Sequence, residues 1–125
     1  MARTVKTPGP DHPITVEPDP SRVVVRAGGK VIADTTAALT LREADYPPVF
    51  YIPLADVTAD TLRPTESQTY CPYKGDASYY TLTTPDGGEI VDAVWTYEKP
   101  YDAVGVIAGH VAFYPQHVEI ATEAA

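Results

Sequence analysis

The sequence of 125 residues contains a single cysteine, Cys71, and only three histidines. A closed structural zinc site takes four ligands, which are usually rich in thiolates. A thiolate-rich zinc site is therefore excluded, no metal or cofactor is expected, and buried apolar side chains must stabilise the fold. One free cysteine fits a reducing compartment, and the first residues lack the apolar stretch of a secretory signal. These features predict a cytoplasmic protein.

Positive charge is scarce in the second half of the chain. The protein carries a net charge of −8, and residues 64–125 contain only two cations, Lys74 and Lys99, against nine acidic residues. Nucleic-acid backbones are bound by clustered lysine and arginine, and anionic membranes attract the same residues. We therefore expect neither nucleic acid nor a membrane surface as a partner.

Long apolar runs are also absent, and no stretch approaches the roughly 18 residues that a membrane span needs. Long helices are disfavoured because 13 prolines and eight glycines interrupt the chain. The segments between them are rich in Val, Ile, Thr and Tyr, which favour strands. We expect one mostly β domain over residues 13–120, with a flexible tail at residues 1–12 and another at residues 121–125.

Two β-hairpins are predicted from turn residues. Residues 22–26 and 30–34 flank Gly28 and Gly29, which can supply the positive φ of a tight turn. Residues 78–84 and 89–97 flank a second turn at residues 85–88. In its second strand, the two-residue period places on one face Val91, Ala93, Trp95 and Tyr97. The other face is also partly apolar, which is typical of a central strand in a curved or barrel-like sheet.

Further short elements are expected between and after these hairpins. Residues 37–43 predict a strand, with a helix as the alternative, and residues 49–52 and 110–114 predict two more strands. Short helical turns are expected at residues 102–108 and at residues 58–63, where Thr58 would cap the turn and Pro64 would end it. If residues 37–43 form a strand, Glu43 points inward with Leu39 and Leu41, and Arg42 points outward.

Residues distributed over nearly the whole chain form a pattern that resembles the sequence pattern of one family. They are Arg22 to Val25, Gly29, Ile32 to Asp34, Glu43, Pro48, Tyr51 to Pro53, Asp56, Val57, Thr69, Cys71 to Gly75, Ala77, Tyr79, Trp95, Tyr97, Pro100, Gly109, Phe113 and Tyr114. Over residues 12–118 the chain is similar to the domain of unknown function 427. The resemblance implies a small antiparallel β-tent fold, in which two splayed sheets meet at one edge. It implies no firm activity, although the family has carried a nucleotidyltransferase label.

The chain lacks two sequence motifs that are relevant to this resemblance, one for zinc binding and one for nucleotide transfer. Relatives with a tent-like fold commonly hold zinc in two Cys-x-x-Cys pairs, which a chain with one cysteine cannot form. Lysine-adenylating enzymes use Lys-x-Asp-Gly, whereas this chain has Lys74-Gly75-Asp76, and it has no Walker-type phosphate loop. Nucleotide transfer is therefore not favoured.

Two residues are candidates for catalysis. Cys71 could be a thiolate activated by Lys74, which lies three residues away; the alternative is core packing, since free cysteine is often buried. Glu43 could be a buried acid or base with a raised pKa; the alternative is a strand end in solvent. Lys74 itself could clamp an anion beside Gly75, or be a solvated surface charge.

Aromatic residues give the strongest general signal. Nine tyrosines and one tryptophan stand against two phenylalanines, so most rings carry a polar group. Such rings can pack within a sheet, or they can line a pocket whose polar groups hold a ligand. We expect a small polar or anionic molecule to bind in an aromatic-lined cleft formed by Glu43, Tyr73, Lys74, Tyr79, Trp95 and Tyr97. The alternatives are an enzyme that uses Cys71 or Glu43 with Lys74 steering an anion, and a protein-interaction module.

Overall fold

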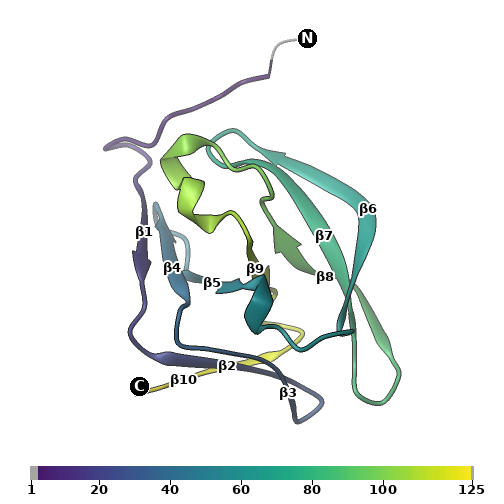
Figure 1. Ribbon diagram of the computed structural model, residues 1–125. Helices are drawn as coiled ribbons and strands as arrows, with labels where there is room; N and C mark the ends of the chain where they lie inside the picture. Colours follow the sequence, from purple (N-terminus) through teal and green to yellow (C-terminus); the bar gives the residue numbers. More distant parts are fainter. Residues whose placement is uncertain (1–2, 125) are drawn as a thin grey trace.

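The computed structural model describes residues 3–124, which form ten strands and two short 3₁₀ helices (Figure 1). The first five strands are β1 (Ile14–Pro18), β2 (Arg22–Ala27), β3 (Lys30–Thr35), β4 (Leu39–Glu43) and β5 (Val49–Pro53). The others are β6 (Leu62–Cys71), β7 (Gly75–Thr83), β8 (Glu89–Thr96), β9 (His110–Phe113) and β10 (Glu119–Glu123). The 3₁₀ helices are η1 (Leu54–Asp56) and η2 (Asp102–Ile107). Met1, Ala2 and Ala125, which belong to the predicted tails, lie outside the described residues.

The strands form two antiparallel sheets, as the family resemblance implies. The large sheet has the order β1-β4-β5-β9-β8-β7-β6, and the small sheet has the order β10-β2-β3. Figure 1 shows the large sheet curving from β1 to β6, with the small sheet across one end. A bridge between Ala33 and Val57, and a 2.7 Å hydrogen bond from the Thr58 amide to the Ile32 carbonyl, join β3 of the small sheet to the segment that follows η1. The sheets are splayed, and the described strands do not close into a barrel.

The two faces of the large sheet pack against different partners. One face meets the small sheet in a first core of aliphatic and aromatic side chains, which includes Val25, Ile52, Leu82 and Val111. The other face carries a second core that includes Leu41, Tyr51, Tyr97, Val104 and Ile107. The last two come from η2, which also contacts β1. Alternation along a strand separates the two cores: neighbouring Tyr51 and Ile52 on β5 face opposite ways.

Both predicted hairpins are confirmed. Gly28 and Gly29 connect β2 to β3 with φ values of 57° and 81°, the left-handed conformation that a primed turn requires. Residues 84–88 connect β7 to β8, and β8 lies between β7 and β9, so the prediction of a central strand is also correct.

The predicted alternation along β8 is wrong at Val91 and Ala93. Asp92 has a φ of 55°, and residues 91–93 stand opposite the single residue Thr81. This bulge leaves the Val91 side chain 68% exposed and places Ala93 in the first core, whereas Trp95 and Tyr97 belong to the second core. The bulge therefore determines which face of the sheet receives the two large aromatic rings.

The helical turn predicted at residues 58–63 is also wrong. The 3₁₀ helix lies earlier, at Leu54–Asp56, directly after Pro53. Asp60 adopts a left-handed φ of 66°, and the chain then enters β6, where Leu62, Arg63 and Pro64 pair with β7. Pro64 is accommodated because β6 is an edge strand. The other predicted strands and the turn at residues 102–108 are confirmed, and residues 39–43 form a strand rather than a helix.

The segments predicted as tails make contacts with the sheets. From the first of them, the Lys6 amide donates to the Pro72 carbonyl at 2.9 Å, and the Thr4 carbonyl accepts from the Tyr70 hydroxyl at 2.6 Å. Arg3 also forms an ion pair with Asp76. At the other end, residues 121–123 lie within β10 and pair with β2, so the ordered sheet extends past the predicted boundary at residue 120. Within residues 3–124, no helix has the length and apolar character needed to cross a bilayer.

Candidate functional site

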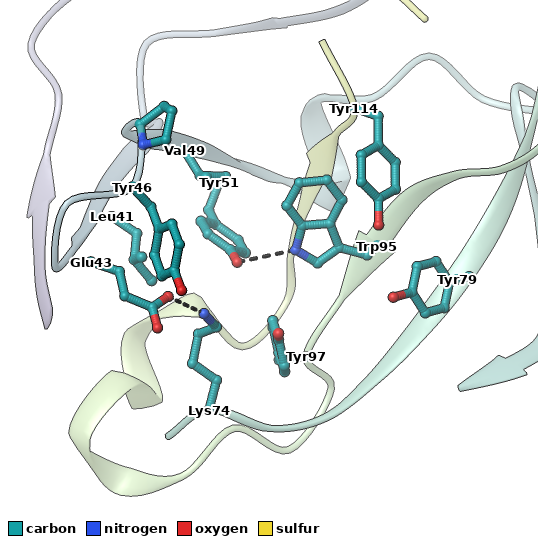
Figure 2. A pocket seen from close by; sticks show the side chains of 11 residues that line it. Leu41, Glu43, Tyr46, Val49, Tyr51, Lys74, Tyr79, Trp95, Tyr97 and Tyr114 are labelled. Atoms are coloured by element: carbon teal, nitrogen blue, oxygen red, sulfur yellow. Dashed lines mark hydrogen bonds and ion pairs between the residues drawn. The ribbon is translucent and has the colours of Figure 1, made fainter. Parts of the chain in front are cut away.

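A cavity of about 250 Å³ opens beside the second core. Figure 2 shows side chains from β4, β5, β7, β8 and the loop before β5 converging on it. The lining residues are Leu41, Glu43, Tyr46, Pro47, Val49, Tyr51, Lys74, Tyr79, Trp95, Tyr97 and Tyr114. Six of these eleven residues are aromatic, and the two charged ones lie together at one end. The cavity therefore has an aromatic wall and a polar end.

Glu43 and Lys74 form an ion pair at the polar end. The Lys74 ammonium contacts Oε1 of Glu43, and each side chain is only 12% exposed. Glu43 is the last residue of β4, and its inward direction agrees with the predicted alternation, since Leu41 is buried and Arg42 is exposed. The sequence left open whether Glu43 points inward or ends the strand in solvent; the structure shows the inward direction, and the solvated strand end is wrong.

Lys74 is positioned by a tight turn between β6 and β7. Its amide donates to the Cys71 carbonyl at 3.2 Å, and its carbonyl accepts from the Tyr101 amide at 3.0 Å. Gly75 follows with a φ of 108°, and a Cβ atom there would lie 3.4 Å from the Lys99 carbonyl oxygen. The positive φ favours glycine at this position, and the two backbone bonds fix the direction from which the lysine enters the cavity.

His12 gives Glu43 a second partner. Nε2 of His12 lies 2.7 Å from Oε2 of Glu43, and the imidazole stacks on Tyr73 with ring centroids 4.0 Å apart and planes within 6°. A carboxylate only accepts hydrogen bonds, so Nε2 carries the proton in this contact. Both oxygens of Glu43 are therefore held, one by a lysine of the sheet and one by a histidine of the N-terminal segment.

These contacts change the expected chemistry of Glu43. Burial raises its pKa, but the hydrogen bonds from Lys74 and His12 and their positive charge outweigh burial, so that the net pKa is lowered. The expectation that a buried Glu43 would have a raised pKa is therefore wrong. At neutral pH Glu43 is an ionised, doubly hydrogen-bonded carboxylate, which makes it a positioning partner for Lys74 rather than a ready proton donor.

The aromatic wall is built from rings that meet edge to face or tilted. Nε1 of Trp95 donates to the Tyr51 hydroxyl at 3.2 Å, and the two ring planes are perpendicular. Trp95 also lies against Tyr114, with centroids 4.5 Å apart. The Tyr79 hydroxyl is 2.9 Å from Oγ1 of Thr69, which orients that ring from β6. The wall is therefore fixed by contacts among its own side chains and with the neighbouring strand.

The phenol hydroxyls supply hydrogen-bond donors to the cavity. Burial raises the pKa of Tyr51 and of Tyr114 to about 12, and burial raises the pKa of Tyr97 further. These groups remain protonated at any physiological pH. Tyr97 is only 7% exposed, and the hydrogen bonds found among residues 3–124 include none to its hydroxyl. Since Tyr97 lines the cavity, its hydroxyl is available to a bound molecule.

The Lys74 ammonium faces the ring of Tyr97 at 5.8 Å from the centroid. In Figure 2 the Tyr46 hydroxyl points toward the Glu43–Lys74 pair from the opposite side. Tyr46 is 65% exposed, so it forms the outer edge of the cavity. The cation thus lies between a buried ring and an exposed one.

Most of the residues predicted for the cleft converge. Glu43, Lys74, Tyr79, Trp95 and Tyr97 all line the cavity. Tyr73 does not; it stacks on the outer side of His12. Cys71 is half-buried and packs against the second core without lining the cavity.

Sequence reasoning missed His12, Tyr46 and Tyr114. Tyr114 is the last residue of the strand predicted at residues 110–114 and belongs to the residues that carry the family resemblance, so the sequence contained a signal for it. Tyr46 lies in a loop, and His12 lies in a segment rich in proline and glycine that has no periodicity. Within the described part of the chain, no group of three or more His, Cys, Asp or Glu residues is arranged to hold a metal ion.

Comparison with protein families supports the resemblance found in the sequence. A family model named NTP_transf_9, described as a domain of unknown function (DUF427), matches residues 15–124. The chain belongs to the DUF427 family. No curated protein matches the chain. The description of DUF427 assigns no reaction, so the function has to be argued from the cavity itself.

Proposed function

We propose that the DUF427 cavity binds a small molecule with an anionic or strongly accepting group, held by Lys74 and by phenol hydroxyls. The observation that carries this proposal is the imbalance between donors and acceptors around the cavity. The only carboxylate in its lining, Glu43, already accepts from two partners. The ammonium of Lys74 has three protons, and the Tyr97 hydroxyl has no partner among residues 3–124. Such a site favours a ligand that accepts hydrogen bonds.

The charge of the site favours a singly charged ligand. Among the described residues, Lys74 is the only cation in the lining, and Glu43 offsets part of its field. A dianionic phosphate is usually held by several cations or by a row of backbone amides. A carboxylate needs only one ammonium and a few hydroxyl donors, and the low exposure of the pair strengthens these contacts relative to water.

The single tryptophan gives a direct test, because Trp95 lies in the cavity wall. Benzoate and benzamide have nearly the same shape and differ in charge. We expect benzoate to change Trp95 emission and to raise the melting temperature more than benzamide does. Saturation at 100 times the dissociation constant adds about 2.7 kcal/mol to stability.

A double variant, Glu43→Gln with Lys74→Met, should lose the response to benzoate. This variant removes both charges together and so leaves no unpaired carboxylate inside the protein. Lys99→Met is the matched control, because Lys99 is the other cation of residues 64–125 and is exposed on the surface. An equal response in the double variant, or equal responses to benzoate and benzamide, would contradict the proposal.

A further inference from the structure

A second hollow adjoins the cavity and differs from it in chemistry. It measures about 430 Å³ and shares four lining residues with the cavity, Tyr46, Pro47, Val49 and Trp95. We call it the apolar groove. No side chain that lines the apolar groove carries a charge, whereas the cavity has Glu43 and Lys74 at its far end. The two hollows are therefore neighbouring compartments, one polar and one apolar, on either side of a shared wall.

The apolar groove lies where the two sheets approach each other. Phe50 and Phe113 come from neighbouring strands of the large sheet, and Ile120 comes from β10 of the small sheet. Phe50 and Ile120 are only partly buried and pack against the first core. Their remaining apolar surface faces the groove, where a ligand could cover it and remove it from water.

We infer that the ligand is an amphipathic monocarboxylate, with its carboxylate beside Lys74 and its hydrocarbon portion across Trp95 in the apolar groove. This inference rests on the proposed function of the cavity and extends it to the rest of the ligand. Two observations support it: the two compartments meet along the four residues that line both, and the cavity alone, at about 250 Å³, is smaller than the roughly 300 Å³ at which ordinary ligand pockets begin.

The charges of the two compartments fix the direction of the ligand. A charged group in the apolar groove would lose its hydration without gaining a partner, whereas Lys74 compensates that loss in the cavity. A hydrocarbon chain has the opposite preference. The polar end of the molecule therefore enters the cavity, and the apolar end lies toward Phe50, Phe113 and Ile120.

Sodium salts of unbranched carboxylic acids from butanoate to decanoate test the inference, each used below its micellar concentration. Binding to the full chain is read from Trp95 emission and by calorimetry. Each methylene that enters the apolar groove should strengthen binding about two- to four-fold, until the groove is full. Octanoate should therefore bind at least tenfold more tightly than butanoate.

Pro48→Glu places a charge in the apolar groove without disturbing either core, because Pro48 is exposed and lines only this hollow. It should remove most of the advantage of octanoate and leave butanoate binding unchanged. Val91→Glu adds the same charge at a distant exposed position and is the matched control. Ile120→Thr is a second groove variant, with its fold checked by circular dichroism.

The possible outcomes distinguish a failure of the amphipathic-ligand inference from a failure of the proposed anion site. If butanoate and octanoate bind equally, and both depend on the Glu43–Lys74 pair, the apolar extension is wrong and the anion site stands. If affinity rises with chain length but survives the Glu43→Gln, Lys74→Met double variant, the placement of the carboxylate is wrong. If no carboxylate binds and the protein instead self-associates in a way that Pro48→Glu abolishes, the groove is an interface between copies of the chain, and the inference is overturned.

Discussion

The two faces of the large sheet are built from the same strands but differ in composition and packing. The face toward the small sheet forms the first core, whose cluster of aliphatic and aromatic side chains is closely packed. The opposite face forms the second core, where tyrosines and a tryptophan border a cavity with a partly buried ion pair. A filled aliphatic layer gives stability, because each methylene there is surrounded by other atoms. A hollow layer with fixed polar groups gives up some of that stability and leaves an open space lined by those groups.

The largest expected effect is a loss of stability in the first core. Leu82 is 0% exposed, and Leu82→Ala should cost about 2–5 kcal/mol of unfolding free energy because it leaves a void that its neighbours cannot fill. Urea denaturation measures this cost. Benzoate affinity should be unchanged in the folded variant, since Leu82 does not line the cavity. Leu54→Ala, at a side chain that is 43% exposed, is the matched control and should change stability by about 0.5 kcal/mol at most.

An intermediate effect is expected from breaking the ion pair on the other face. Lys74→Met alone leaves the Glu43 carboxylate buried with only His12 as a partner and should cost about 1–3 kcal/mol. The Glu43→Gln, Lys74→Met double variant should cost less than the sum of the two single changes, because it removes the unpaired charge. Strictly additive costs in urea denaturation would show that Glu43 and Lys74 have no energetic interaction with each other.

The smallest and most specific effect is a dependence on pH. The pKa of Glu43 is lowered in the folded protein from its ordinary value of 4.5, so the ionised form stabilises the fold above that pH. This contribution is lost as the pH falls below 4.5 and through the folded pKa. The difference in unfolding free energy between the wild type and Glu43→Gln should therefore be constant near neutrality and shrink in acid. A difference that stays the same down to pH 3 would contradict the lowered pKa.

The same two faces explain what the sequence could and could not predict. The hairpins at residues 22–34 and 78–97 were correct because their turns are specified locally by glycine. The inward direction of Glu43 followed from simple alternation along β4. The faces of β8 could not be assigned in the same way, because Asp92 adds a bulge that exchanges them. The helical turn at residues 58–63 failed because pairing of Leu62 and Arg63 with β7 overrides a local cap.

The candidate site was predictable to the extent that its residues lie on regular strands. Trp95, Tyr79 and Glu43 come from strands, and all three line the cavity. His12 has no such signal, since its contact with Glu43 joins positions 31 residues apart and depends on how the N-terminal segment crosses the turn at Tyr73. Contacts of this kind arise only when the complete fold brings a loop to a strand.

The position of His12 has a practical consequence for defining the minimal functional unit. The family match begins at residue 15, three residues after the imidazole that holds one oxygen of Glu43. A fragment trimmed to the family boundaries would retain nearly all of both sheets, yet it would open that oxygen to solvent and leave Tyr73 without its stacking partner. The shortest piece that keeps both partners of Glu43 therefore starts upstream of the region by which the family is recognised.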